Sequence, residues 1–152
     1  MVKVIKYDEK YKAALLNAIS GELDSEKSAA LGEFLTRTEN DKTVWALVCL
    51  NESGEPVGYA TGELLPRGEE KITDIFVLKD LRRQGIGSVI LVSAFYYATL
   101  RLSLRINADC EKKNQTAISF FGARTFTKTA ETQTAVSFTK SLLPMYAKHE
   151  DV

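Results

Sequence analysis

The sequence contains very few of the residues that build metal sites and disulfide frameworks. Its 152 residues include one histidine, His149, and two cysteines, Cys49 and Cys110. The cysteines lie far apart and form no CxxC motif or Cys/His cluster, so we expect no metal site and two reduced core thiols. His149 lies near a polar C-terminus, which makes it a poor candidate for catalysis or metal binding.

The chain also lacks a net charge and a long hydrophobic segment. Twenty Lys and Arg residues balance 20 Asp and Glu residues, so no overall field would attract nucleic acid or an anionic membrane. The longest nearly apolar run, Val89 to Leu100, is too short to span a bilayer. The first ten residues lack the apolar core of a signal peptide. We therefore expect a cytoplasmic protein that binds neither nucleic acid nor membrane.

No repeat, linker or low-complexity segment divides the chain. A length of 152 residues suits one domain with one hydrophobic core, and we expect a single domain over residues 1–152. An apolar content of 45% and a charged content of 26% are ordinary for a soluble globular protein.

Hydrophobic periodicity predicts a mixed α/β domain in the order β-α-α-β-β-β-α-β-α-β-β, with a central mixed sheet of about seven strands. The expected strands are residues 2–7, 43–50, 57–65, 71–78, 102–109, 126–128 and 134–139. The expected helices cover residues 8–20, 24–35, 87–101 and 114–124. Strands two to four should form an antiparallel meander, and the helix crossover should place the fifth strand parallel to the fourth.

Finer features of these elements follow from individual residues. The second helix should bury a stripe of Ala30, Leu31, Phe34 and Leu35 and end in the polar segment 36–41. The helix over 87–101 is apolar nearly all round, which predicts that most of its sides are covered. Gly58 and Gly62 weaken the third strand and suggest close approach by another backbone or a ligand. The tail KHEDV should be frayed.

A loop rich in arginine and glycine follows the fourth predicted strand, in the stretch VLKDLRRQGIGSVIL. Gly85 and Gly87 can adopt backbone angles that other residues resist, and they leave room for a ligand to touch the main chain. Arg82 and Arg83 add two permanent charges with planar donor groups. The helix that follows directs its free N–H groups and the positive end of its dipole into the same loop. Together these features predict an anion site that suits phosphate.

Two nucleotide-binding motifs fit this loop poorly. The dinucleotide fingerprint requires a third glycine where this chain has Ile90, and it requires an acidic residue farther on that is missing. The Gly-Lys-Ser/Thr ending of a P-loop is absent as well. Nucleotide binding at the loop is therefore the weakest of the functional alternatives.

The spacing Arg82-x-x-Gly85-x-Gly87 resembles the [RQ]-x-x-G-x-[GA] motif of the GNAT-type N-acetyltransferases, in which this loop cradles coenzyme A. The predicted order of elements resembles that of the same superfamily. The resemblance implies a GNAT-like fold and acetyl-CoA as the cosubstrate. The pyrophosphate contacts that it implies fall on Arg83, Gln84, Gly85, Ile86, Gly87 and Ser88, mostly through the main chain. Arg82, the first residue of the motif, is a further expected cofactor-binding residue.

The resemblance also implies two further contact regions for coenzyme A. The edge of the fourth strand, at Ile75, Phe76 and Val77, would be free to bind the pantetheine arm and to aim an N–H at the thioester oxygen. Asn114 is a good helix cap by its own chemistry, and the resemblance adds a hydrogen bond to the pantetheine arm.

The chain departs from the family pattern at two positions after Asn114. Phe121 stands where the family has the tyrosine that protonates the leaving thiolate, and Phe121 has no proton to donate. Thr125 stands where the family has a glycine. Where the tyrosine route is used, losing the hydroxyl costs on the order of 10²–10⁴-fold in rate. Tyr59, in the third strand, is the first substitute for the proton donor, although an aromatic packed in the core is the plainer interpretation.

A general base must take a proton from the attacking ammonium, because only the neutral amine is nucleophilic. Asp74 shares a strand face with Ile72 and Phe76, which predicts a half-buried carboxylate with a raised pKa. Asp109 and Glu63 are rival candidates, and each also has a plain interpretation as a solvated charge at the end of a strand.

Two functions from different classes follow. The first is an acetyl-CoA-dependent N-acetyltransferase in which a primary amine of a small molecule or a protein attacks the thioester directly in a ternary complex. The alternative is a non-catalytic acyl-CoA-binding module of the same fold, which the loss of the tyrosine hydroxyl at Phe121 favours. The resemblance also allows a homodimer, although no sequence feature requires one.

Overall fold

The structure is a computed structural model that describes the backbone of residues 1–150 and the side chains of residues 1–146. Its strands form one seven-stranded mixed sheet in the order β1-β2-β3-β4-β5-β7-β6, which confirms the predicted fold class. The chain divides into two compact units. Unit 1 comprises Met1–Glu63 and Asp74–Ala94, and unit 2 comprises Leu64–Thr73 and the chain from Phe95 onward. The elements β3, β4 and α3 contribute to both units.

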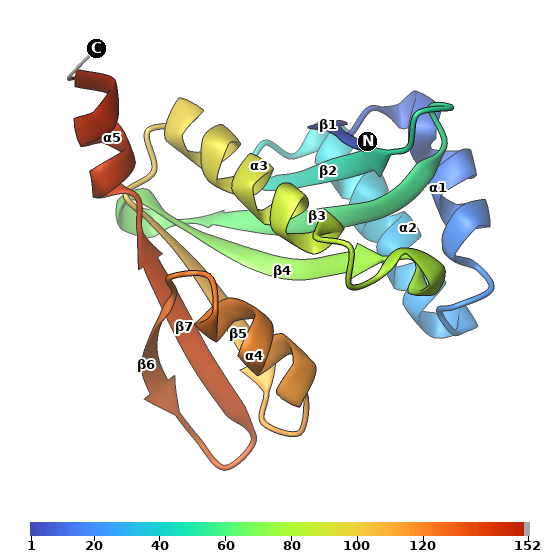
Figure 1. Cartoon of the computed structure of the whole chain (residues 1–152). Helices are drawn as coiled ribbons and strands as arrows, with labels where there is room; N and C mark the ends of the chain where they lie inside the picture. The colour runs from blue at the N-terminus through green and yellow to red at the C-terminus, as the bar shows by residue number, and fades with distance from the viewer. Residues whose placement is uncertain (151–152) are drawn as a thin grey trace. The chain divides into compact units, whose positions relative to one another are not determined.

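Unit 1 is built around the first strands of the sheet and two helices (Figure 1). Its elements are β1 (Lys3–Lys6), η1 (Glu9–Tyr11), α1 (Lys12–Ile19), α2 (Ser25–Asn40), β2 (Val44–Leu50), most of β3 (Pro56–Leu65), the end of β4 (Glu69–Val77), η3 (Lys79–Leu81) and the start of α3 (Ile86–Leu100). The strands β1 and β2 pair antiparallel, as do β2 and β3. The side chains of Asp8 and Asp24 accept hydrogen bonds from Lys10 N–H and Lys27 N–H, so both predicted N-caps are present.

The core of unit 1 forms where α1 and α2 pack on one face of the strands. Its buried residues come from both helices and from alternate strand positions: Leu15, Ile19, Leu31, Leu35, Ala46, Val48, Leu50 and Tyr59. Burying an aliphatic side chain of this size contributes about 1.5–3 kcal/mol. Ala30 is exposed rather than part of the stripe. The helix α2 also continues through most of the polar segment to Asn40, where the Arg37–Asp41 ion pair and the bond from Asp41 N–H to Arg37 O close its last turn.

Both glycines of β3 permit the close approach that their sequence predicted. A Cβ at Gly58 would lie 2.6 Å from the Phe76 carbonyl oxygen, so the backbone of β4 lies against this position. A Cβ at Gly62 would overlap the ring of Trp45. In both cases the neighbour belongs to the protein itself.

Unit 2 contains the second half of the sheet and the helices beside it (Figure 1). Its elements are the end of β3, η2 (Pro66–Gly68), the start of β4, the end of α3, β5 (Arg105–Glu111), α4 (Gln115–Gly122), β6 (Thr127–Glu131), β7 (Ala135–Ser141) and α5 (Leu143–Glu150). The strands β4 and β5 are parallel in the register from Glu69↔Arg105 to Ile72↔Ala108, as predicted. The antiparallel hairpin of β6 and β7 also matches its prediction, and β7 is the strand that pairs with β5.

Two features of the second half of the chain differ from what its sequence predicted. The strand β5 begins at Arg105 instead of Leu102, because Leu102 has a φ of 62° in a turn that Gly68 O and Leu104 N–H anchor by a hydrogen bond. The helix α5 was not predicted. It covers the part of the KHEDV tail up to Glu150, while residues 151–152 and the His149 side chain lie outside the described part of the structure.

The helix α3 is covered on most of its sides, as its apolar composition predicted, but one face is exposed. Val92, Tyr96 and Leu100 are 60%, 52% and 61% exposed, and they recur at spacings of four residues along one face. The opposite face is buried through Ile90, Ala94 and Ala98. Apolar composition predicted the helix correctly but could not tell which of its faces is covered. None of the helices within residues 1–150 is both long and apolar enough to cross a membrane.

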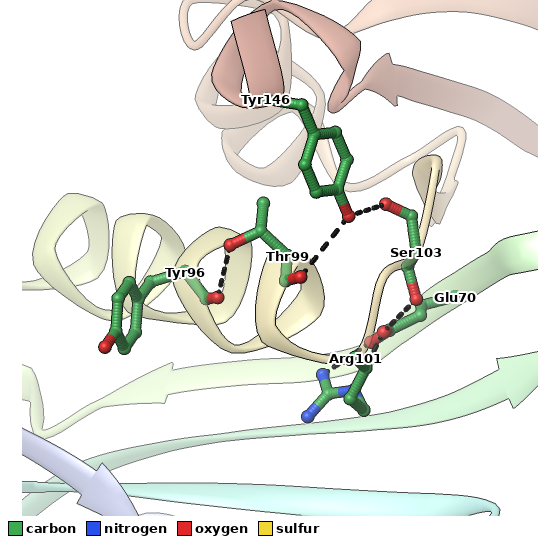
Figure 2. A network of polar contacts seen from close by, with 6 residues as sticks. All are labelled: Glu70, Tyr96, Thr99, Arg101, Ser103 and Tyr146. Atoms are coloured by element: carbon green, nitrogen blue, oxygen red, sulfur yellow. Dashed lines mark hydrogen bonds and ion pairs between the residues drawn. The ribbon is translucent and has the colours of Figure 1, made fainter. Parts of the chain in front are cut away.

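A buried carboxylate holds the turn between α3 and β5 in unit 2 (Figure 2). Glu70 is fully buried, and Arg101 donates two hydrogen bonds to it at 2.8 and 2.6 Å. Ser103 donates a third hydrogen bond to the same carboxylate. Tyr146 of α5 donates to the Ser103 carbonyl oxygen at 2.6 Å, so the last helix is tied to the same turn.

Candidate functional site

The glycine loop of unit 1 contains two residues with left-handed backbone conformations. Arg83 and Gly85 both have positive φ angles, of 64° and 83°, and α3 begins directly afterwards at Ile86. A Cβ at Gly85 would meet nothing within 4 Å, so the backbone angle and not the space requires glycine there. The buried Ile86 side chain anchors the start of the helix, so the N-terminal end of α3 lies directly at the loop.

The two arginines of the loop differ in their surroundings. Arg82 donates from Nε to the carbonyl oxygen of Val77 at 2.8 Å, and its guanidinium lies 5.3 Å from the centre of the Phe76 ring. Arg83 is exposed, and within the described residues its side chain has no hydrogen bond or ion pair. The loop therefore has one arginine held by the protein and one available to a ligand.

The edge of β4 that should face the pantetheine arm belongs to unit 1. Ile75, Phe76 and Val77 are half-buried residues at the end of this strand. The Val77 carbonyl accepts the Arg82 hydrogen bond, and Leu78 N–H donates to Val57 O at 3.0 Å.

Asp74 and Tyr59 are two predicted site residues that the fold brings into direct contact. The Tyr59 hydroxyl donates to Asp74 Oδ2 at 2.6 Å across the neighbouring strands of unit 1. Tyr59 is only 2% exposed and stacks on Phe76 with ring centres 5.6 Å apart. Burial and the nearby Asp74 carboxylate raise the pKa of the Tyr59 hydroxyl. Asp74 itself is exposed, so the half-buried carboxylate expected from its strand face is not found.

The two rival carboxylates have different surroundings. Asp109, in unit 2, forms an ion pair with Lys71 at 2.9 Å, and the hydrogen bond from Lys71 lowers the pKa of the Asp109 carboxyl. A base needs the opposite shift, so Asp109 is poorly suited to that role. Glu63, in unit 1, is half-buried near the end of β3, opposite Val44 in the register.

The predicted site residues of unit 2 lie in and around α4. Asn114 caps this helix, because its side-chain oxygen accepts from Ala117 N–H at 3.1 Å. Phe121 is buried, and its ring lies 5.1 Å from the Phe126 ring and 6.1 Å from the Phe138 ring. Thr125 has a φ of 67°, a conformation that glycine adopts without strain.

Sequence reasoning missed one residue beside the loop. Glu22, in the turn between α1 and α2, accepts a hydrogen bond from Lys79 N–H at 2.7 Å. Its carboxylate also lies 3.6 Å from Arg82. The two contacts span about 60 residues of sequence, so no local pattern could have indicated them.

No cluster of metal-binding side chains occurs among the residues that the structure describes. Cys49 and Cys110 are both buried and unpaired there, as expected for core thiols.

The sequence matches one protein family over most of its length. The family profile described as the acetyltransferase (GNAT) family matches residues 12–126. No curated protein matches the sequence.

Solved structures resemble most of the chain at low sequence identity. An N-acetyltransferase from Thermoplasma acidophilum in complex with coenzyme A has a TM-score of 0.76 at 11% identity, over 93% of this chain and 99% of that chain. The ribosomal-protein-S18-alanine N-acetyltransferase of Escherichia coli has a TM-score of 0.71 at 15% identity, over 93% and 94%. A spermidine/spermine N-acetyltransferase from Vibrio cholerae has a TM-score of 0.75 at 10% identity, over 97% and 96%. At these low identities, the similarity shows that the folds are alike.

Proposed function

Because the chain belongs to the acetyltransferase (GNAT) family, we propose that it transfers an acetyl group from acetyl-CoA to a primary amine by direct attack in a ternary complex. The observation that carries this proposal is the glycine loop at the start of α3. Its positive φ angles at Arg83 and Gly85, its exposed arginine and its helix N-terminus suit the pyrophosphate of coenzyme A.

The proposed contacts with the cosubstrate divide among the predicted residues. Main-chain N–H groups of Gln84 to Ser88 and the Arg83 side chain bind the pyrophosphate. The N–H groups of Ile75 to Val77 bind the pantetheine arm and stabilise the charge that develops on the thioester oxygen. Asn114 contributes a further hydrogen bond to the pantetheine arm, and Phe121 packs near the thiol end. The coenzyme A complex of the Thermoplasma acidophilum protein supports the choice of ligand.

Asp74 is the proposed general base. Its carboxylate is exposed, so an acceptor can reach it, and Tyr59 holds one of its oxygens by a hydrogen bond of 2.6 Å. In the proposed reaction Asp74 removes a proton from the acceptor ammonium. The neutral amine then forms the C–N bond to the thioester carbonyl carbon, whose oxygen becomes an oxyanion. As the tetrahedral intermediate collapses, the C–S bond breaks and the nitrogen releases its second proton to solvent. Glu63 is the remaining alternative base in unit 1.

The proton that the leaving thiolate needs has no donor at position 121. Tyr59 was the first substitute, but the raised pKa of its hydroxyl and its donation to Asp74 make it a poor acid. The thiol of coenzyme A is acidic enough to depart as a thiolate and take a proton from solvent. We therefore assign Tyr59 to the orientation of Asp74.

The amine acceptor, the oligomeric state and the cellular location of the protein are also proposals. The similar structures include enzymes named for a ribosomal protein and for spermidine and spermine, which supports an amine of a protein or a small molecule. The family match over residues 12–126 runs through both units and supports a single catalytic domain. A homodimer and a cytoplasmic location stay predictions, which sedimentation of the purified chain and imaging in cells would test.

A second candidate function is an acyl-CoA-binding module without turnover. The observation that favours it is Phe121, whose ring is buried among other aromatic rings where the family has a hydroxyl donor. This candidate shares every binding contact with the first one and omits the chemical step.

Thiol release separates the two functions. Purified protein is incubated with acetyl-CoA and a panel of amines that includes a polyamine, an aminoglycoside and a peptide with a free N-terminus, while free coenzyme A thiol is measured. Amine-dependent release supports the transferase. Binding of acetyl-CoA without release on any amine supports the module.

The Phe121→Tyr variant refines this result. We expect thiol release within twofold of the wild type, together with a loss of about 1 kcal/mol in unfolding free energy because a hydroxyl enters an aromatic cluster. A tenfold gain in release would instead mean that the missing donor limits the reaction.

A further inference from the structure

Glu22 joins the turn between α1 and α2 to the segment that leads into the glycine loop. One carboxylate oxygen, Oε1, accepts the hydrogen bond from Lys79 N–H at 2.7 Å and lies 3.6 Å from Arg82 Nη2. The residue Glu22 is exposed as a whole, while its side chain is 26% exposed because it lies against the connection between β4 and α3. Because Lys79 is the first residue of η3, this contact holds the start of the connection between β4 and α3.

Arg82 extends the same contact to the end of β4. Its Nε donates to the Val77 carbonyl oxygen at 2.8 Å, while its guanidinium lies over the Phe76 ring. The Arg82 guanidinium therefore has three neighbours, which are the Val77 carbonyl, the Phe76 ring and the Glu22 carboxylate. These contacts restrain an arginine whose side chain is 51% exposed, and so they restrain the backbone at the start of the glycine loop.

Arg83 is free of such contacts. It follows Arg82 directly, its φ of 64° turns the chain, and its exposed side chain has no hydrogen-bond or ion-pair partner within the described residues. The two arginines thus divide two tasks that the motif alone would assign to both. Arg82 holds the loop, and Arg83 keeps its charge available for an anion.

We propose that Glu22 is a positioning residue for coenzyme A binding, which clamps Arg82 against the end of β4 and so sets the distance from that strand end to the glycine loop. This inference rests on the proposed function. Coenzyme A would have to contact both places, with its pantetheine arm at Ile75 to Val77 and its pyrophosphate at Gln84 to Ser88. A loop at the wrong distance could satisfy one contact only at the expense of the other.

The direction in which a substitution at Glu22 changes the affinity for coenzyme A distinguishes a positioning role from a purely electrostatic one. Removing a negative charge close to an anion site should strengthen the binding of coenzyme A, if charge were all that mattered. A clamp predicts the opposite, because Arg82 loses its partner and the loop loses its fixed position. Glu22→Gln keeps an acceptor for Lys79 N–H and loses the charge that faces Arg82, whereas Glu22→Ala loses both.

The experiment measures the dissociation constant of coenzyme A by titration calorimetry on the full chain, at one ionic strength. We expect binding to weaken by about threefold for Glu22→Gln and by about tenfold for Glu22→Ala. Glu26→Gln is the matched control, because Glu26 is an exposed acid four residues away without a side-chain partner in the described residues. This control should leave the dissociation constant unchanged or lower it slightly.

A double-mutant cycle tests the division between the arginines. Glu22→Gln combined with Arg82→Gln should weaken binding little more than either change alone, since both break the same contact. Glu22→Gln combined with Arg83→Gln should raise the dissociation constant by the product of the two single factors, because the two residues act independently. In turnover, the Glu22 variants should raise the KM for acetyl-CoA and leave kcat within twofold of the wild type.

Each outcome has one interpretation. If the wild type binds no coenzyme A, the proposed function fails. If the wild type binds and Glu22→Ala binds equally well or more tightly, the clamp is refuted and the proposed function stands. Multiplicative effects of Glu22→Gln and Arg82→Gln would also refute it. Amide hydrogen exchange of residues 79–88 gives a readout without ligand, and the clamp requires faster exchange there in Glu22→Ala at unchanged global stability.

Discussion

At the scale of single residues, the contact between Tyr59 and Asp74 separates a buried group from an accessible one. The phenol lies in the core with Leu15 and Val48, while the carboxylate that it orients reaches solvent. A hydroxyl in that position can hold a carboxylate in one orientation without touching the acceptor. This arrangement supports the proposal that Asp74 removes the proton and that Tyr59 orients Asp74.

Asp74→Asn is the direct test of the base. We expect amine-dependent thiol release to fall by about 10²-fold, because the amide cannot accept the ammonium proton. Binding of coenzyme A should change less than twofold, since Asp74 contacts none of the proposed ligand groups. Glu63→Gln is the comparison, and it should release thiol at the wild-type rate. A larger loss in Glu63→Gln than in Asp74→Asn would transfer the role to Glu63.

Thr125 has a strained backbone conformation at a position where the family has a glycine. A branched side chain at a φ of 67° is strained by about 1–2 kcal/mol, and part of this is offset by its hydroxyl, which accepts a hydrogen bond from Lys140. We expect Thr125→Gly to raise the unfolding free energy by about 0.5–1 kcal/mol in urea denaturation, after the greater chain entropy of glycine is subtracted. Thr125→Ala keeps the strain and loses the hydroxyl, so it should bring no gain. Equal stabilisation by both variants would contradict the role of the backbone angle.

At the scale of elements, the end of α3 depends on one buried ion pair. Glu70 receives hydrogen bonds from Arg101 and Ser103, and Tyr146 links the same turn to α5 (Figure 2). Removing one partner of a buried pair leaves the other charge without compensation, which is why such contacts are costly to break. The turn between α3 and β5 therefore relies on side chains from three separate segments.

Glu70→Gln tests this dependence against a neighbouring control. We expect a loss of about 3 kcal/mol in unfolding free energy, measured by urea denaturation. Glu69→Gln breaks the adjacent ion pair with Arg105, whose side chains are 31% and 52% exposed, and it should cost at most about 1 kcal/mol. Similar losses in the two variants would mean that the burial of Glu70 does not determine its contribution.

At the scale of the whole molecule, ligand binding should appear as added stability. A ligand at 100 times its dissociation constant adds about 2.7 kcal/mol to the folded state. For a chain of this size that corresponds to a rise in Tm of roughly 5–10 °C. We expect this shift with acetyl-CoA in a thermal unfolding experiment and less than 1 °C with ATP or NAD at the same concentration. A shift with a nucleotide and none with acetyl-CoA would overturn both coenzyme A proposals.

Short-range patterns in the sequence determined most of the architecture. The caps at Asp8, Asp24 and Asn114, the glycines of the turns and the alternation of the strands are local features, so the order of elements follows from neighbours in the chain. The glycine loop was predictable for the same reason, because its spacing lies within six residues. Elements without such signals were missed, as α5 and the full length of α2 illustrate.

Only the tertiary structure decided which side chains meet and which reach solvent. The exposure of Asp74, its hydrogen bond from Tyr59 and the exposed face of α3 depend on what packs against each surface, which no single stretch of sequence contains. The contact of Glu22 with Lys79 and Arg82 joins residues about 60 positions apart. Local patterns in the sequence were therefore enough to predict a glycine loop of the GNAT type between β4 and α3. The fold decided that Arg82 is held by the protein while Arg83 is free, because long-range packing selects the partners of each charge.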